Sequence, residues 1–145
     1  MAHVTFAAPG LPGTSQTVLA DAAYAPGVCN IGPAEVARRR RSGHIGLIAT
    51  VVLLVVLVAI QAPPLARLLI AAPAVIAASG YLQARLRFCA GFGSLGTYNF
   101  GPLGQTQQAP DPADRARDRA RARQIGAASI AIGIAVGVVA VLLPL

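Results

Sequence analysis

The sequence predicts an all-α membrane protein with three transmembrane helices, an N-terminus in the cytoplasm and a C-terminus outside. Of its 145 residues, 55% are hydrophobic and only 12% are charged, unlike the composition of a typical soluble domain. The apolar residues gather in three charge-free runs, at 45–66, 68–84 and 125–145. A helix needs about 17 to 25 such residues to cross roughly 30 Å of hydrocarbon. Because backbone amides in lipid must pair within their own segment, and the runs do not alternate, each run is expected to be a helix.

The second run is the shortest and contains Pro73, Gly80 and Gln83, so a buried or re-entrant segment is an alternative. The sequence Gln-Ala-Pro-Pro at 61–64 favours a tight exposed turn, because adjacent prolines do not continue a helix. We therefore expect the first two spans to form a hairpin. Pro73 should kink the second helix about one turn after its start.

The positions of the basic residues predict the orientation. All twelve cationic side chains are arginines, and only Arg67 lies between the first two spans. The others precede the first span or lie in the loop at 85–124, which places both of these segments on the cytoplasmic side by the positive-inside rule. Multi-pass insertion in the bacterial cytoplasmic (inner) membrane is expected.

The arginines beside the spans are candidate contacts for anionic lipid head groups, worth about 1 kcal/mol per nearby basic residue. A formal net charge of +7 also raises the possibility of nucleic-acid binding. Aromatic residues do not interleave with the arginines as a stacking platform requires, so nucleic acid is not expected as a partner. The candidate head-group residues are Arg38, Arg39, Arg40, Arg41, Arg85 and Arg87.

The segment before the first span is divided into an irregular tail at 1–28 and a helix start. Asn30 or Gly32 can cap this helix, Pro33 suits its first position, and Glu35 favours the positive end of the helix dipole. We expect a short basic helix on the membrane surface, with a bend near Gly43, that leads into the first span.

The loop at 88–101 is rich in glycine and aromatic residues. Gly91, Gly93 and Gly96 match the dinucleotide fingerprint G-x-G-x-x-G, but a membrane helix precedes them where the fingerprint requires a strand. Cofactor binding is therefore not expected. The aromatic side chains are expected to anchor the loop at the lipid head groups; they are Phe88, Phe92, Tyr98 and Phe100.

After a polar linker at 102–112, an arginine-rich helix is expected to continue into the third span, together covering 113–145. Asp114 with Arg117, and Asp118 with Arg121, have the i, i+3 spacing of ion pairs on one helix face. Within the span, Ser129, Gly133 and Gly137 form a small-residue stripe at four-residue spacing. Such a stripe lets another helix approach closely, although small residues are also common in alanine-rich membrane helices.

Two short motifs resemble those of the YgaP-type transmembrane domain, a small two-helix membrane domain of unsettled function found alone or fused to rhodanese (sulfurtransferase) domains. The opening motif reads Asn30-Ile-Gly32 with Glu35 and Arg39, and the closing motif comprises Cys89, Phe92 and Gly96. The resemblance covers about residues 29–101. It departs at Val36, where the family has arginine, and at Ala90, where the family has proline.

The resemblance implies that the hairpin brings both motifs to one membrane face, where Cys29 and Cys89 could form a thiol pair. Both cysteines lie on the predicted cytoplasmic side, where thiols remain reduced, so a structural disulfide is not expected. A thiol near arginines has more thiolate character. Buried cysteines also serve as small packing residues.

The three runs contain no Asp, Glu, Lys, Arg or His, and His44 lies just before the first. This absence argues against an enzyme that acts inside the bilayer and against a transporter or ion channel that works as a monomer. His44 and His3 have no metal-ligand spacing to other residues, so neither a metal nor a cofactor is expected. We expect a non-enzymatic accessory or structural membrane protein, oligomeric or a subunit of a larger complex. Its expected partners are membrane lipids and other membrane-protein helices or itself. The alternatives are a thiol-redox or sulfur-handling protein and an anionic-lipid-binding membrane organiser.

Overall fold

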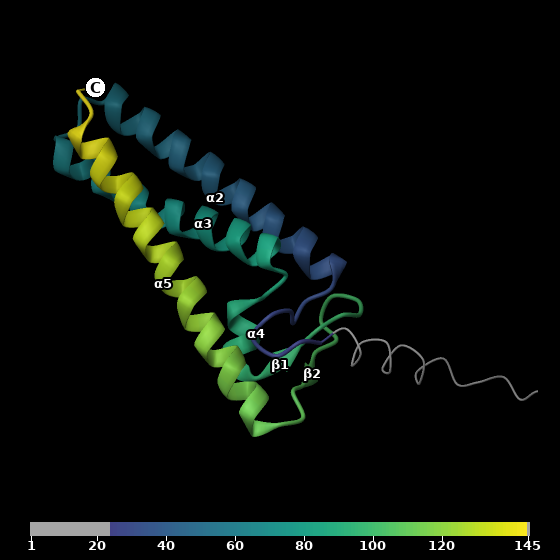
Figure 1. The fold of residues 1–145 in the computed structure, drawn as a ribbon. Helices are drawn as coiled ribbons and strands as arrows, with labels where there is room; N and C mark the ends of the chain where they lie inside the picture. Colours follow the sequence, from purple (N-terminus) through teal and green to yellow (C-terminus); the bar gives the residue numbers. More distant parts are fainter. Residues whose placement is uncertain (1–23, 145) are drawn as a thin grey trace, which may run out of the picture.

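The computed structural model of the chain describes residues 24–144 (Figure 1). His3 and most of the predicted tail at 1–28 therefore lie outside the described residues. The described part is mostly helical, with one short two-stranded hairpin. Its elements are α2 (Pro33–Ala59), the 3₁₀ helix η1 (Pro64–Ile70), α3 (Ala71–Leu86), α4 (Ala90–Leu95), β1 (Thr97–Tyr98), β2 (Gln107–Gln108) and α5 (Pro112–Leu142).

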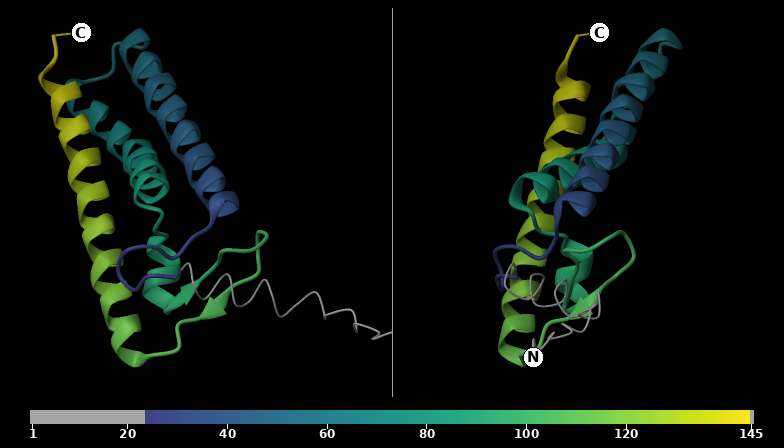
Figure 2. Two further views of the ribbon diagram at one scale, coloured as in Figure 1. Left: turned by 45° about the vertical axis from the view of Figure 1, so that its right-hand side comes forward. Right: turned by 90° about the vertical axis from the view of Figure 1, so that its right-hand side faces the viewer.

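Three helical segments are long and apolar enough to cross a membrane, as the sequence predicts. They are α2, the continuous helical stretch Pro64–Leu86 formed by η1 and α3, and α5. α2, α3 and α5 form a bundle, and α5 extends past the others at its N-terminal end (Figures 1 and 2). Residues 24–32 and 87–122, including α4, β1 and β2, gather there. We call this part the head.

The first span and the basic segment before it form one uninterrupted helix. α2 begins at Pro33 with Gly32 as the N-cap, as predicted, and continues to Ala59. The expected separate basic helix with a bend at Gly43 is therefore wrong. Gly43 instead packs against the ring of Tyr81. This contact leaves little room for a side chain at position 43.

The second span begins after a connection at 60–63, close to the turn predicted at 61–64, but its first part is not an α-helix. Residues Pro64–Ile70 form a 3₁₀ helix, and the α-helix begins only at Ala71. Pro73 thus lies in the first turn of α3, where a missing N–H is readily tolerated. The predicted kink inside an α-helix is replaced by a change of helix type before the proline.

Helices α2 and α3 pack with their backbones close together. A Cβ atom on Gly46 would lie 2.5 Å from the backbone nitrogen of Ala77, and a Cβ on Gly80 would collide with the backbone of Gly43. Contacts this short do not occur between real side chains and backbone, so both positions require glycine. This hairpin brings the start of α2 beside the end of α3.

The small-residue stripe of α5 packs within the chain. A Cβ on Gly133 would collide with Val75 and would lie 2.8 Å from the carbonyl oxygen of Ala71; a Cβ on Gly137 would lie 3.1 Å from the Ala71 Cβ. Ser129 is buried, and its hydroxyl donates to the Ile125 carbonyl at 2.8 Å. The close approach that these residues permit is thus made by η1 and α3 of the same chain.

The head has its own small core. Phe88 is fully buried and packs with Ala122 and Ile125 of α5, and Tyr98 is 4% exposed. The expectation that these two aromatic residues anchor a loop in the lipid head groups is wrong, because the loop folds around them. Phe92 and Phe100 are only partly buried.

Candidate functional site: a buried thiol beside a carboxylate and an arginine

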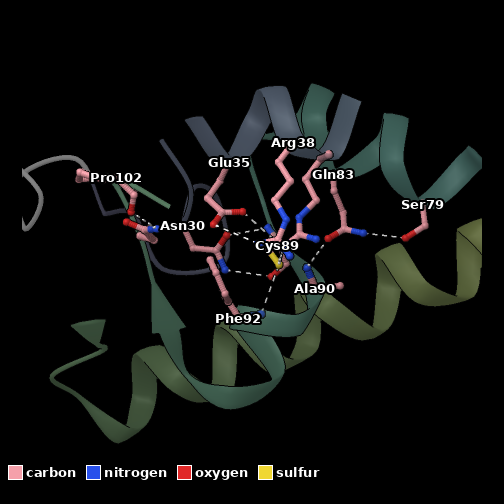
Figure 3. A network of polar contacts seen from close by, with 11 residues as sticks. Asn30, Glu35, Arg38, Ser79, Gln83, Cys89, Ala90, Phe92 and Pro102 are labelled. Atoms are coloured by element: carbon pink, nitrogen blue, oxygen red, sulfur yellow. Dashed lines mark hydrogen bonds and ion pairs between the residues drawn. The ribbon is translucent and has the colours of Figure 1, made fainter. Parts of the chain in front are cut away.

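A polar cluster lies where the head joins the bundle, and Cys89 is at its centre (Figure 3). α3 ends at Leu86, and the left-handed conformation of its C-cap residue Arg87 (φ 50°) turns the chain towards α4. Cys89 is the N-cap of α4, and its sulfur accepts the backbone N–H of Phe92 at 3.4 Å. The cysteine is 2% exposed.

Asn30 ties the start of α2 to this junction through two reciprocal hydrogen bonds. Its Oδ1 accepts the backbone N–H of Cys89 at 2.7 Å, and its Nδ2 donates to the Cys89 carbonyl at 3.1 Å. Asn30 is fully buried, so its amide cannot bind water. Loss of either hydrogen bond would leave a buried polar group without a partner, which would destabilise the fold. The residue that the sequence suggested as a helix cap instead holds the two motifs together.

Arg39 of α2 bridges the sulfur and a carboxylate. Its Nη2 donates to Cys89 Sγ at 2.9 Å, and the same nitrogen lies 3.6 Å from Glu35 Oε2. The guanidinium also lies over the ring of Phe92, at 5.8 Å from the ring centroid, which suits the preference of arginine for aromatic faces. The guanidinium of Arg39 therefore places a positive charge next to both the Glu35 carboxylate and the Cys89 sulfur.

Glu35 is the least satisfied polar group of the cluster. Its carboxylate is 1% exposed and lies 3.7 Å from Arg38 Nη1 as well as 3.6 Å from Arg39. These distances allow electrostatic attraction but are too long for hydrogen bonds. Neither carboxylate oxygen accepts a hydrogen bond from the residues that the structure describes. Figure 3 shows the carboxylate directed towards Cys89.

Gln83 completes the wall of the cluster on the α3 side. Its Oε1 accepts the backbone N–H of Ala90 at 3.0 Å, and its Nε2 donates to Ser79 Oγ at 2.6 Å. A proline at position 90, as in the YgaP-type motif, could not donate this bond. The departure at Ala90 is therefore matched by a local partner in this chain.

The structure places the two predicted thiols in different surroundings. Cys29 is partly exposed, and its thiol points to the Ile31 carbonyl at 3.9 Å, a weak contact. Cys89 faces Arg39. Both are free cysteines, so no disulfide joins them.

A second polar cluster fixes the chain before α2 to the head. The hydroxyl of Tyr24 donates to Asp118 Oδ2 at 2.7 Å, and the Gly27 N–H donates to Oδ1 at 2.7 Å. Burial, reinforced by the Asp118 carboxylate, raises the pKa of the Tyr24 hydroxyl. The predicted Asp118–Arg121 pair is wrong, because Arg121 donates instead to Gln124 at 3.2 Å.

The exposed charges at this end of the molecule are mostly positive. Glu35 and Asp118 are buried, and Asp114 forms the predicted ion pair with Arg117 at 3.7 Å. Of the six predicted head-group residues, only Arg39 is partly buried. The exposed arginines are Arg38, Arg40, Arg41, Arg85, Arg87, Arg117, Arg119 and Arg123.

Comparison of the chain with protein-family models, curated proteins and solved structures gave no match. Within residues 24–144, no group of three His, Cys, Asp or Glu side chains is placed to hold a metal ion.

Several residues of the cluster could not be found by reasoning from sequence. The sequence indicates Glu35 by its place in the first turn of the helix and in the opening motif, and Gln83 by its polarity within the second span, but neither observation predicts a partner. The cluster forms because Arg39 reaches Cys89, 50 positions away, and a contact at this separation leaves no local pattern in one sequence. The hydrogen bond from Tyr24 to Asp118 likewise joins residues that are remote in sequence, and no local pattern predicts it.

Proposed function

We propose that this protein is a small accessory membrane protein in which a three-helix anchor holds a compact, arginine-rich head against anionic lipid head groups. One observation carries this proposal. Among the described residues, two of the four acidic side chains are buried, while eight arginines are exposed, all of them in the head or on the helix ends beside it. The surface at this end thus combines high positive charge with attachment to a membrane.

The anchor offers an apolar surface suited to lipid. On α2, exposed large hydrophobic side chains follow each other over several turns, among them Ile45, Ile48, Val52 and Val55. In water such a surface would be costly, whereas in a bilayer it contacts acyl chains. The exposed arginines begin where this surface ends, at the depth where basic side chains meet head groups.

The arginine distribution supports an orientation with the head in the cytoplasm and the C-terminus outside. Arg67 lies at the opposite end of the anchor, where it donates to the carbonyl oxygens of Ala140 and Leu143 at 3.3 and 2.9 Å. The resemblance to the YgaP-type domain supports a bacterial inner membrane. Anionic lipids in the cytoplasmic leaflet would then face the arginines.

The accessory role extends to assembly with a second copy or with another membrane protein. The Ser129, Gly133 and Gly137 stripe does not serve this association, since η1 and α3 of the same chain occupy it. Isolation of the chain in mild detergent at native expression level, with determination of mass and composition, tests this part. A defined larger assembly is expected. Recovery of a lone monomer would contradict the proposed assembly with a second copy or another membrane protein.

The lipid part is tested on the full chain by native mass spectrometry after reconstitution with equal amounts of phosphatidylglycerol and phosphatidylcholine. We expect retained phosphatidylglycerol, and loss of most of it in the double variant Arg40→Gln, Arg41→Gln. The comparison variant, Arg117→Gln with Arg119→Gln, removes the same charge further from the apolar span and is expected to lose less phosphatidylglycerol. At about 1.5 Å per residue, Arg119 lies roughly 9 Å along α5 before Ile125, near the screening length of salt. Equal retention in all three proteins would contradict lipid binding by these arginines.

A further inference from the structure

Cys89 has surroundings that a packing cysteine does not need. Two N–H groups point at its sulfur, the Arg39 Nη2 at 2.9 Å and the Phe92 backbone nitrogen at 3.4 Å. Donors of this kind stabilise negative charge on sulfur, and the thiolate is the nucleophilic form of cysteine. The sulfur alone would not define a site.

The second observation is the unsatisfied Glu35. A carboxylate that is 1% exposed normally accepts several hydrogen bonds, yet its two oxygens accept none from the described residues. The Nε of Arg39, also buried, has no acceptor. Among the described residues, an unused acceptor on Glu35 and an unused donor on the Arg39 guanidinium, which also contacts the sulfur, therefore lie in one cluster. A small molecule carrying both an O–H donor and an acceptor oxygen matches them.

The Cys89 sulfur is almost fully buried, and Gly91 is the neighbouring residue at which a side chain would cover it further. Cys89 is 2% exposed, which excludes bulky reagents from the folded site. Gly91, which is exposed, lies beside it. A Cβ added at Gly91 would meet the Cys89 sulfur as its nearest neighbour, at 3.7 Å, an ordinary van der Waals distance. A side chain at this position would cover the sulfur without forcing the backbone to move.

We propose that Cys89, Arg39 and Glu35 form a reactive site for small hydroperoxides. Glu35 accepts the peroxide O–H, and Arg39 donates to the oxygen that leaves. The Cys89 sulfur attacks the other oxygen, so that an S–O bond forms while the O–O bond breaks. Sulfur is oxidised by two electrons to a sulfenic acid, and the peroxide is reduced to water or an alcohol. The thiol proton ends on the departing oxygen, which balances the step.

Hydrogen peroxide is the probe. The full-length protein with Cys29→Ser, in lipid nanodiscs, is exposed to peroxide for set times, and the peroxide is then removed with catalase. The chain is denatured in the presence of a dimedone-type trap, so that the bulky trap meets Cys89 only after unfolding, and the adduct on Cys89 is quantified by peptide mass. We expect Cys89 to react at least about tenfold faster than in the denatured chain, as one charge-assisted hydrogen bond would provide. Reaction at or below the rate in the denatured chain would overturn the proposal.

Five variants separate a reactive site from a thiol that is merely shielded by the fold. Arg39→Gln and Glu35→Gln are each expected to slow trapping about tenfold, while Arg39→Lys restores part of the rate. Since the first two changes could also disturb folding, Gly91→Val provides an independent arm. It is expected to slow trapping with an unchanged thermal midpoint, whereas Leu95→Ala, an exposed residue on the same helix, changes neither. Equal trapping in Gly91→Val and the parent would contradict the access route and the proposal.

Discussion

The hydroxyl of Tyr24 donates a 2.7 Å hydrogen bond to Asp118 Oδ2, although the two residues are 94 positions apart in the chain. The Gly27 N–H donates to the other carboxylate oxygen, and the ring of Tyr24 stacks on Tyr98 with centroids 4.5 Å apart. The segment that precedes α2 is thus fixed to α5 by a fully buried carboxylate. This contact closes the head around its core.

Replacing Asp118 with asparagine should loosen this segment. The change keeps the shape but removes the charge and one acceptor, leaving a buried donor without a partner, which costs about 1–3 kcal/mol. Hydrogen exchange of the amides at 25–30 should accelerate accordingly. Asp111→Asn is the control, because Asp111 is exposed and makes no side-chain cap. Equal exchange in both variants would show that the hydrogen bonds of Asp118 to Tyr24 and Gly27 contribute little to the stability of this segment.

The stability of the head should fall at high pH. Because the pKa of Tyr24 is raised in the folded chain, the stabilisation is complete below the unfolded pKa of about 10 and is lost as pH rises through the folded pKa. Difference absorbance between the parent and Tyr24→Phe isolates the phenolate of Tyr24. We expect this signal to appear only above the pH at which free tyrosine ionises. Ionisation at the ordinary pH would contradict the buried hydrogen bond.

Leucine at Gly133 should destabilise the monomer rather than an oligomer. The added side chain collides with Val75 and the backbone of α3, and overpacking of this kind costs about 1–3 kcal/mol or more. A lower thermal midpoint in detergent at unchanged particle mass is the expected result. Gly126→Leu in the same helix should be tolerated, because a Cβ there has no neighbour within 4 Å among the described residues. A change of mass without a change of midpoint would instead assign the stripe to assembly.

Methionine at Arg67 should release the last turn of α5. The buried guanidinium donates to the carbonyls of Ala140 and Leu143, and hydrogen bonds to charged groups contribute about 1.5–3 kcal/mol each. Hydrogen exchange at 140–144 is expected to rise in Arg67→Met. Arg85→Met, which removes an exposed arginine at the other end of the bundle, should leave this region unchanged.

Local composition and the limits that proline sets on the backbone are enough to predict three helices long and apolar enough to span a membrane, a turn at 61–64 and a helix start at Pro33. The structure has these helices, the connection at 60–63 and α2 beginning at Pro33. The sequence also predicted a continuous helix at 113–145, observed as Pro112–Leu142, and the Asp114–Arg117 pair, whose members lie one turn apart.

The contacts between remote residues are visible only in the folded structure. Asn30 pairs with the backbone of Cys89 instead of capping a helix, Asp118 binds Tyr24 instead of Arg121, and Gly133 packs on α3 of its own chain. Phe88 and Tyr98 enter a core instead of lipid. In each case the partner is remote in sequence, and the choice depends on which buried polar or apolar group would otherwise remain unpaired, a balance that local patterns do not contain.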